Sequence, residues 1–444
     1  MSQTAVLKGD SLARKLFSVA LFAQTQRLPG FGRQLTGPSA DAGSAISKIK
    51  GQSVPDMPIV RVTDLSKTAG DTISVDMFGV IGGAPIAGDQ IAEGRGEKLT
   101  SSSMDISVNL LTKAVDAGGK MSQQRTLQDL RTIAMAQLTN YFARLDDQSS
   151  LAHMAGARGF QVQNDWVIPL QSDTVNFPDV MVNPVLAPTY NRHFVASTTS
   201  LVKGGAQLAS ILATDILRLE HIDALRTYLD ELEYPLQPVR IVDDPAAADD
   251  PMWVMYVSPR QYSSLLSGAG ASLRTFQQNA WNRASYGSKH PLFKGEVGMW
   301  NGILVKKLNR SIRFYGAGTN TPVSAVQYVT QANAALGTAT ESTLNISASI
   351  STTSNTNGVP TGGAAVDRAL LLGAQALGNV YGKNKSSDYF FSWLERQYNF
   401  ERNLEVAGDM MGGKAKLRFN YDESGIKVPT DHGVIVLDTA VSLT

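Results

Sequence analysis

Near its start the chain has a serine whose surroundings could support ester hydrolysis. Ser11 stands in the sequence Gly9-Asp10-Ser11-Leu12. A serine nucleophile of this kind needs a buried strand in front of it and a histidine base, three residues after an aspartate near the C-terminus. No apolar strand precedes Ser11, and the only late histidine, His432, directly follows Asp431. We therefore expect Asp10 or Ser11 to cap a helix over residues 11–24, and we assign no catalytic residue.

A glycine-rich stretch at residues 408–415 comes close to a phosphate-binding loop. Gly408, Gly413 and Lys414 have the P-loop spacing, in which a Ser or Thr after the lysine holds magnesium and a helix follows. Here that next residue is Ala415, and the residues beyond it alternate as in a strand. The stretch therefore predicts a turn before a strand rather than a nucleotide site.

Metal binding has weak support in the sequence. Two acidic pairs, Asp243-Asp244 and Asp249-Asp250, flank a proline and three alanines and could share a cation, but such residues are typical of turns. The five histidines lack metal-ligand spacing, and we expect each to be a packing or surface residue: His153, His193, His221, His290 and His432. We predict no metal and no cofactor.

The composition indicates a protein with substantial cores. The 444 residues correspond to about three domains. A hydrophobic content of 43% is well above the disordered range, and a net charge of +1 does not mark a nucleic-acid or membrane binder. The absence of cysteine excludes disulfides and thiolate sites and suits a reducing cytosol. We expect neither a transmembrane helix nor a secretory signal.

One long helix organises the predicted elements. Apolar residues from 122 to 155 recur three or four positions apart, as on one face of a helix: Leu127, Leu130, Ala134, Leu138, Tyr141 and Leu145. Ser122 is the predicted N-cap, and Gly156 and Gly159 provide the stop. A helix of roughly thirty residues is about 45 Å long, so it should cross a whole domain.

A two-stranded ribbon is predicted in front of this helix. Two segments alternate apolar and polar residues and flank a glycine-rich tip, and their apolar members are Ile73, Val75, Met77, Met104, Ile106, Val108 and Leu110. Because a two-stranded ribbon is marginal in water, this stripe needs a further surface. We expect that surface on a neighbouring subunit, so that Val108→Asp or Ile106→Asp would leave the monomer folded and block assembly.

Shorter patterns predict the remaining elements. Strands are expected at residues 59–65, 253–257, 297–300, 303–308, 415–420 and 433–437, and helices at 212–232, 258–266 and 367–377. Asn301-Gly302 predicts a type I′ hairpin turn. Residues 161–188 read as an irregular connection. Residues 316–363, rich in Ser, Thr and Asn, are either a flexible linker or an inserted surface subdomain, of which we favour the insertion.

Local sequences that occur in a fixed order add a resemblance from about residue 70 onward. The stretches are Gln124-Arg125, Asp129-Leu130-Arg131, Asp146-Asp147-Gln148, residues 151–156, Asn191-Arg192-His193, residues 236–241, Tyr256-Val257-Ser258-Pro259, residues 290–296, Trp300-Asn301-Gly302, and residues 367–375, 413–419 and 431–435. Taken together they resemble the phage capsid-like coat-protein family, which includes the coats of N-four-like podophages. Residues 316–363 and the segment before Pro55 match least.

The resemblance implies an α+β chain with the Hong Kong 97 type of capsid fold. Its parts would be an N-terminal arm at residues 1–58 and an extended loop, the two-stranded ribbon, at 59–121. A peripheral domain with the long spine helix would comprise residues 122–204 and 388–444. An axial domain would comprise residues 205–387, including the insertion at 316–363.

The same resemblance implies a structural role. The protein would be a major capsid protein that assembles into pentamers and hexamers of the icosahedral head of a tailed bacteriophage, built in the host cytoplasm around double-stranded DNA. Expected partners are other copies of itself, a separate scaffolding protein, a portal and a decoration protein, with non-specific DNA contact and no membrane. The seven stripe residues of the ribbon would form the subunit interface. An extracellular adhesin or carbohydrate-binding module using residues 316–363 is the alternative, and an enzyme comes third.

Overall fold

The fold is described from a computed structural model of the chain. It defines residues 34–37, 52–63, 70–78, 85–86, 93, 95–96, 101–125, 129–159, 166–170, 173, 175–198, 200–203, 211–232, 234–240, 251–267, 296–308, 310–317, 364–382, 391–423 and 426–442. The predicted helix at 11–24 with Ser11, the acidic pairs of 243–250, His290, most of the ribbon tip and residues 318–363 lie outside these ranges.

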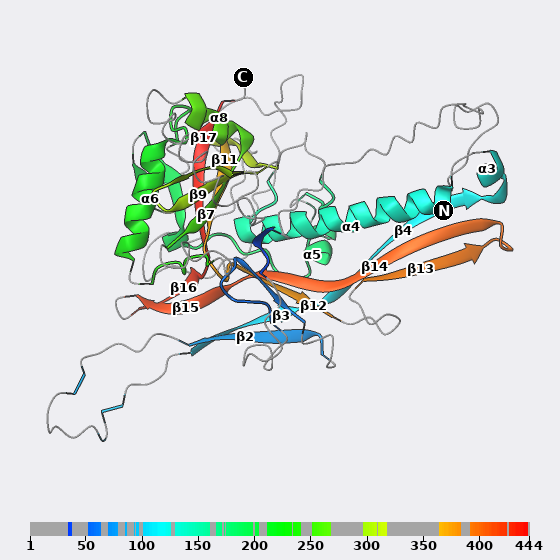
Figure 1. The fold of residues 1–444 in the computed structure, drawn as a ribbon, viewed down its shortest axis with the longest axis horizontal. Helices are drawn as coiled ribbons and strands as arrows, with labels where there is room; N and C mark the ends of the chain where they lie inside the picture. The colour runs from blue at the N-terminus through cyan, green and yellow to red at the C-terminus, as the bar shows by residue number, and fades with distance from the viewer. Residues whose placement is uncertain are drawn as a thin grey trace.

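An eight-stranded mixed sheet forms the larger body of the molecule (Figure 1). Its strand order is β6-β5-β17-β11-β7-β9-β8, and β10 also pairs with β11. The strands are β5 (His193–Ala196), β6 (Leu201–Lys203), β7 (Trp253–Val257), β8 (Glu296–Trp300), β9 (Ile303–Lys307), β10 (Ile312–Ala317), β11 (Ala364–Leu372) and β17 (Val434–Val441). The predicted strands at 253–257 and 433–437 are confirmed.

Both faces of this sheet carry a hydrophobic core. Alternate residues of the central strands point to opposite faces, so Leu370 and Leu371 belong to different clusters. One face packs on α6 (Leu219–Glu231) and α8 (Pro259–Ser267), and the other packs on the end of a long helix. Burial on both faces explains the near-continuous apolar sequence of β11, which periodicity alone cannot distinguish from a helix.

A five-stranded sheet forms a long extension beside the larger body (Figure 1). It contains β1 (Ile59–Val62), β4 (Asn109–Gly119), β12 (Leu377–Tyr381), β13 (Phe391–Tyr398) and β14 (Asn403–Lys416). The 14-residue β14 is its spine, because β13 and β12 pair with successive parts of one edge and β4 pairs with the other edge. Strand β14 thus joins the far end of the extension to the larger body.

The long helix α4 (Leu130–Ala155) lies along this second sheet (Figure 1). It begins later than predicted, because Asp129 rather than Ser122 is the N-cap and accepts hydrogen bonds from the backbone N–H groups of Arg131 and Thr132. Ser122 belongs to a separate short helix, α3 (Lys120–Arg125). The predicted stop is confirmed: Gly156 adopts φ 69°, and a Cβ there would meet the Leu186 carbonyl oxygen at 2.6 Å.

The predicted ribbon is confirmed in its core but is shorter than expected. Strands β2 (Thr72–Phe78) and β3 (Ser101–Ser107) pair antiparallel, with Ile73 opposite Ile106 and Val75 opposite Met104. Residues 59–62 and 109–119, which were expected to belong to the loop, are strands β1 and β4 of the five-stranded sheet. A second hairpin, β15 (Arg418–Glu423) with β16 (Ile426–Asp431), lies beside β3.

Several local predictions are confirmed and others are wrong. Asn301 and Gly302 have positive φ in the β8–β9 turn, and α8 follows Ser258 as expected. The predicted helix at 367–377 is instead β11 and the start of β12. The expected turn at 408–415 is wrong, because these residues lie inside the extended strand β14. The helix expected at 212–232 begins only at Leu219, and the connection 161–188 contains α5 (Asn176–Met181).

The described sheets do not follow the predicted domain limits closely. Strands β5, β6 and β17 were expected in the peripheral domain, yet they share one sheet with β7 to β11 of the expected axial domain. The division into four parts remains a prediction, with the eight-stranded sheet as one physical unit.

Candidate assembly surface and buried polar clusters

The ribbon turns its apolar stripe toward its own chain. Ile73 is 6% and Ile106 is 0% exposed, and both belong to a core cluster with residues of β1, β12 and β15. Val75, Met77, Met104 and Val108 pack partly buried against the same cluster. This corrects the expectation that the whole stripe lacks a surface within its own chain. It also corrects the expected effect of Ile106→Asp, which would place an unpaired charge in a core.

Hydrogen bonds between the Asn183 side chain and backbone groups hold the base of the ribbon close to β14. The Asn183 side chain accepts a hydrogen bond from the Ser107 N–H and donates to the carbonyl oxygens of Ser107 and Lys414. A Cβ on Gly413 would lie 1.8 Å from the Ser107 carbonyl oxygen, so only glycine permits this approach. Ile73 and Ile106, the paired stripe residues next to this contact, are therefore fixed against their own chain. Subunit contact through the remaining stripe residues stays a prediction.

Leu110 differs from the other six stripe residues. It lies in β4, opposite Met411 of β14, and is 44% exposed. It therefore belongs to the five-stranded sheet rather than to the ribbon, and among the seven residues it is the one with a large exposed apolar side chain.

The distal half of the five-stranded sheet has one covered and one accessible face. On the covered face α4 packs through Phe142, whose ring meets Phe391 edge-on at 5.1 Å between centroids. On the other face Leu394 of β13 is 50% exposed, and it lies in register with Ala407 of β14 and Ala114 of β4. At the end of the β13–β14 hairpin Phe400 is 96% exposed. These side chains were not singled out in the sequence.

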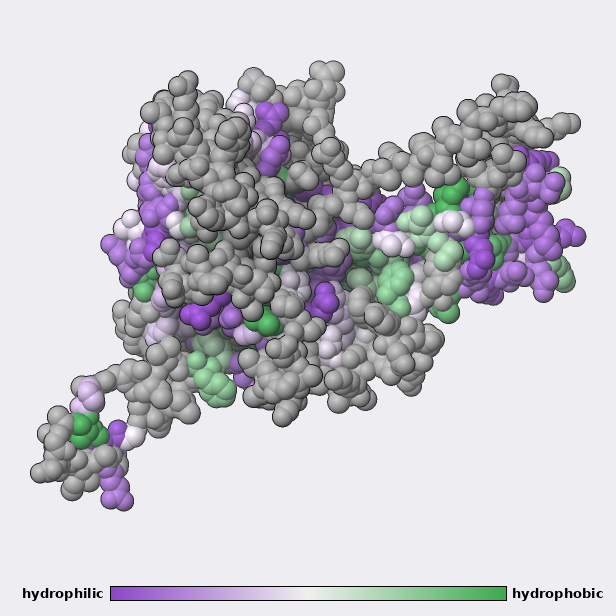
Figure 2. Space-filling model, viewed as in Figure 1, coloured by the Kyte–Doolittle hydropathy of each residue, from purple (hydrophilic) through white to green (hydrophobic). Residues whose placement is uncertain are grey.

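The outward side of α4 also lacks charge over much of its length. Residues 132–143 contain no charged side chain, although Thr132, Met135, Ala136 and Thr139 are exposed. Figure 2 shows this part of the extension in pale to green colours, whereas the end carrying α3 is mostly hydrophilic. A solvent-facing helix normally presents charged residues, so this face is suited to contact with another protein surface.

Buried ion pairs join the end of α4 to the eight-stranded sheet. Asp438 of β17 accepts hydrogen bonds from both Arg368 and His193, with the His193 Nε2 at 2.6 Å. Arg368 is fully buried and also donates to the Ala155 carbonyl oxygen at the end of α4. Burial alone would raise the pKa of Asp438, but the Arg368 guanidinium and His193 lower it to about 2. Burial of the His193 side chain lowers its pKa in turn.

A second buried cluster surrounds Asp431, at the end of β16. Its carboxylate accepts hydrogen bonds from Lys416 at 2.7 Å, from Arg418 at 2.9 Å and from the Thr189 N–H at 3.2 Å. Burial lowers the pKa of Lys416 to about 8, against the opposing effect of Asp431. Arg418 also donates to the Ala187 carbonyl oxygen. The cluster therefore ties β14, β15 and the segment after α5 together.

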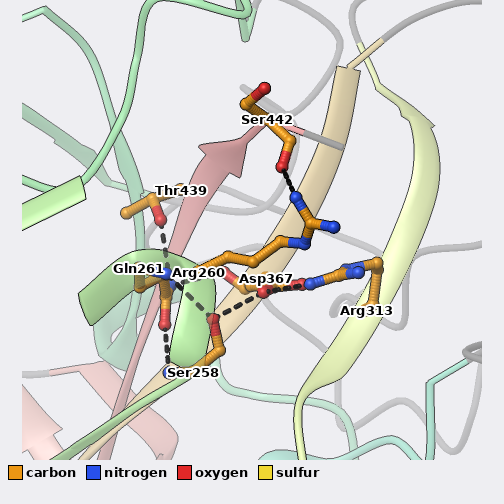
Figure 3. A network of polar contacts seen from close by, with 7 residues as sticks. All are labelled: Ser258, Arg260, Gln261, Arg313, Asp367, Thr439 and Ser442. Atoms are coloured by element: carbon orange, nitrogen blue, oxygen red, sulfur yellow. Dashed lines mark hydrogen bonds and ion pairs between the residues drawn. The ribbon is translucent and has the colours of Figure 1, made fainter. Parts of the chain in front are cut away.

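A third cluster lies under α8 (Figure 3). The Asp367 carboxylate of β11 accepts hydrogen bonds from Nε and Nη2 of Arg313, at 2.6 and 2.7 Å. It also accepts a hydrogen bond from the Ser258 hydroxyl at 2.5 Å. Gln261 of α8 accepts a hydrogen bond from the Ser258 N–H and donates to the Asp367 carbonyl and to Thr439. These groups are mutually paired, so the geometry indicates a structural network rather than a substrate site.

A small pocket with both apolar and polar lining residues lies where α4, β12 and β14 meet. Its volume of about 20 Å³ has room for one water molecule. Lys414 lines it and pairs with Asp146 at 2.7 Å, and the unpartnered His153 Nδ1 belongs to another lining residue. Burial lowers the pKa of His153 to about 3. The cavity is too small for a nucleotide, although Lys414 and Gly413 belong to the P-loop-like stretch.

The four described histidines are placed as packing residues. His153, His193 and His432 are buried in polar contacts, and His221 accepts from the Arg218 N–H at the start of α6. Among the described residues no three His, Asp or Glu side chains come together as a metal site, and no described helix has the length and apolar character to cross a membrane.

Sequence reasoning missed the buried charges and the exposed end of the β13–β14 hairpin. A signal for the buried charges was present: Lys414, Lys416 and Arg418 alternate with Ala415 and Leu417, a pattern that predicts three cations on one side of a buried strand. In the structure Lys414 and Lys416 end β14, and Arg418 begins β15. Such cations require acidic partners, which the structure supplies as Asp146 and Asp431.

A family profile and several solved structures are similar to the chain. The profile of a family described as phage capsid protein matches residues 4–443. The capsid of Ralstonia phage GP4 is similar in structure, with 22% identity, a TM-score of 0.68 and 99% of each chain covered. The cyanophage Pam1 capsid asymmetric unit follows with 16% identity, a TM-score of 0.61 and both chains fully covered. The head structure of Helicobacter pylori bacteriophage KHP40 has 10% identity, a TM-score of 0.55 and 98% of each chain covered. None of the curated protein sequences compared with the chain matched it.

Proposed function

The chain belongs to the phage capsid protein family, and on that premise we propose that its copies assemble into pentamers and hexamers of a phage head around double-stranded DNA. It is a major capsid protein with the α+β capsid fold of the Hong Kong 97 type. The observation that carries the proposal is the extent of the family match, which spans residues 4–443 rather than one motif.

The distribution of apolar surface supports assembly. The eight-stranded sheet is packed on both faces, whereas the extension presents an uncharged helix face, Leu110, Leu394 and Phe400 to solvent. Exposed apolar groups of this kind are typical of protein contacts. Much of the ribbon stripe packs against its own chain, so the extension offers more accessible apolar surface for contact between copies.

The remaining partners follow from the same role. We propose a separate scaffolding protein as one of these partners. A portal, a decoration protein and assembly in the host cytoplasm are further expectations. A net charge of +1 supports loose, non-specific DNA contact, since each neutralised phosphate would strengthen the hold.

The role needs no catalytic chemistry. The ion pairs and hydrogen bonds of the three polar clusters are internal, and Ser11 and the acidic pairs of 243–250 lie outside the described residues. The adhesin alternative, based on residues 316–363, gains no support from the comparisons.

Expression of the chain alone and with the scaffolding protein of its phage tests the proposal. Negative-stain images should show shells, tubes or capsomers. A strictly monomeric particle under all assembly conditions would contradict it.

Leu110→Asp tests the interface role of the most exposed stripe residue. The monomer should keep its circular dichroism and its melting temperature, because the side chain is 44% exposed, while shell yield should fall. Shells formed in normal yield would remove Leu110 from the interface.

A further inference from the structure

Phe400 is an aromatic side chain held away from its own chain. It is 96% exposed at the end of the β13–β14 hairpin. Asn399, Phe400 and Glu401 all adopt the left-handed region, with φ of 54°, 53° and 60°. This conformation is unfavourable for residues with a Cβ, so the turn needs support. The Arg402 N–H donates to the Asn399 carbonyl, and the Lys120 N–H donates to the Arg402 carbonyl.

These contacts fix the turn while leaving the ring without neighbours. Lys120 begins α3, so the hydrogen bond to Arg402 ties the turn to the end of β4 as well as to its own strands. A large, rigid aromatic ring on a fixed turn loses little conformational entropy on binding and is typical of interface hot spots.

A complementary surface lies on the accessible face of the same sheet. Leu394, Ala407 and Ala114 form one row across β13, β14 and β4, which we call the distal row. Leu394 is 50% exposed and Ala114 is exposed. The leucine and the two alanines together form a small apolar strip on this face. The next row, Arg396, Glu405 and Asp116, borders this strip with polar groups.

We propose that Phe400 of one copy packs on the distal row of a second copy. The inference rests on the proposed assembly and specifies one of its contacts. Phe400 does not pack on its own Leu394, because its side chain is 96% exposed and the strand from Leu394 to Tyr398 already spans about 13 Å before the turn begins. The charges agree, since Glu401 and Arg402 flank the ring while Arg396 and Glu405 border the row. Two different surfaces meet in such a contact, which repeats from copy to copy and forms a ring where the rotation between copies closes.

Cysteine cross-linking tests the contact directly, because the chain contains no cysteine. Phe400→Cys and Leu394→Cys are made as separate variants, assembled alone and as a one-to-one mixture, and oxidised as intact shells. A disulfide requires Cα atoms within about 7 Å. We expect covalent dimers in the mixed shells, with peptides of both sites in the linked product, and none in shells of either variant alone.

Two results would overturn the proposal. Mixed wild-type-like shells without linked dimers would show that the two positions are apart. Dimers in shells of Phe400→Cys alone would show that the ring meets its counterpart on another copy. If the unmodified chain forms no shells or capsomers at all, the proposed function fails instead, so the two failures are distinguishable.

A second measurement separates packing from folding. Phe400→Asp should leave the melting temperature of the monomer unchanged and lower shell yield about tenfold or more, as expected for an aromatic hot spot. Phe400→Leu should restore most of the yield. Val175→Asp is the matched control, because Val175 is 68% exposed and lies outside both surfaces. Equal yields of Phe400→Asp and Val175→Asp shells would contradict the proposal.

Discussion

The eight-stranded sheet and the distal half of the five-stranded sheet differ in how many of their faces are covered. In the first, both faces are covered and even charges are buried, with Asp438 and Arg368 fully enclosed. In the second, α4 covers one face while Leu394 on the other face is 50% exposed. The difference shows that apolar surface is covered in the first region and partly left accessible in the second, and the proposed contact between copies rests on that accessible part.

The largest expected effect comes from breaking a buried pair in the first region. Asp438→Asn leaves Arg368 buried without its counter-charge and should lower the free energy of unfolding by about 3–5 kcal/mol in urea titrations. The control is Glu395→Gln, which removes the exposed partner of Arg131 at the start of α4 and should change stability far less. Similar losses for both variants would remove the contrast between the regions.

The next largest effect separates two residues of the predicted ribbon stripe. Ile106→Ala should destabilise the subunit by about 2–4 kcal/mol, because the side chain is 0% exposed in a core cluster. Leu110→Ala should cost less than about 1 kcal/mol, because nearly half of the side chain is already in water. Thermal and urea unfolding of the two purified variants measure this. A small loss for Ile106→Ala would return the stripe to the subunit interface.

Acid should weaken the subunit through a buried histidine beside the β15–β16 hairpin. Burial and the nearby Arg192 lower the pKa of His432 to about 4, so between pH 6.5 and about 4 the unfolded chain binds a proton that the folded chain does not. Stability from this group is therefore lost as the pH falls, by about 1.4 kcal/mol per pH unit inside that window. His432→Gln should flatten the slope of unfolding free energy against pH there. An unchanged slope would contradict the buried, neutral state.

A smaller effect tests the joint between ribbon and sheet. Gly413→Ala should destabilise by about 1–3 kcal/mol, since its Cβ would meet the Ser107 carbonyl oxygen at 1.8 Å. Gly96→Ala is the matched control, because no atom lies within 4 Å of a Cβ there. Melting temperatures of the two variants compare them. A Gly413→Ala subunit as stable as the control would mean that the ribbon base moves freely from β14.

Patterns of short range predicted much of the fold. Period-two alternation located β2 and β3, Asn301-Gly302 located the β8–β9 turn, and Gly156 located the end of α4. The helix predicted at 367–377 is wrong because its apolar residues fit the helical period of 3.6 and the pattern of a buried strand equally well. Strand β11 reads as a helix because both of its faces are buried, and this burial depends on β7 and β17, which are distant in sequence.

The surface for assembly was harder to predict than the fold. Periodicity shows that one face of the ribbon is apolar, but it does not show what covers that face. The cover for Ile106 comes from residues such as Leu417 and Phe419, about 300 positions away. The exposure of Phe400 depends on the three-residue left-handed turn, which carries no glycine to mark it in the sequence.

Strand β14 has a mechanical consequence. Its fourteen residues form one uninterrupted peptide path of about 46 Å from the turn beside Phe400 to Lys416. A force applied to the far end is therefore transmitted along covalent bonds to the cations that Asp146 and Asp431 hold in place. Tension between neighbouring subunits would therefore load these ionic anchors together with the core in which Val406 and Met410 of β14 pack.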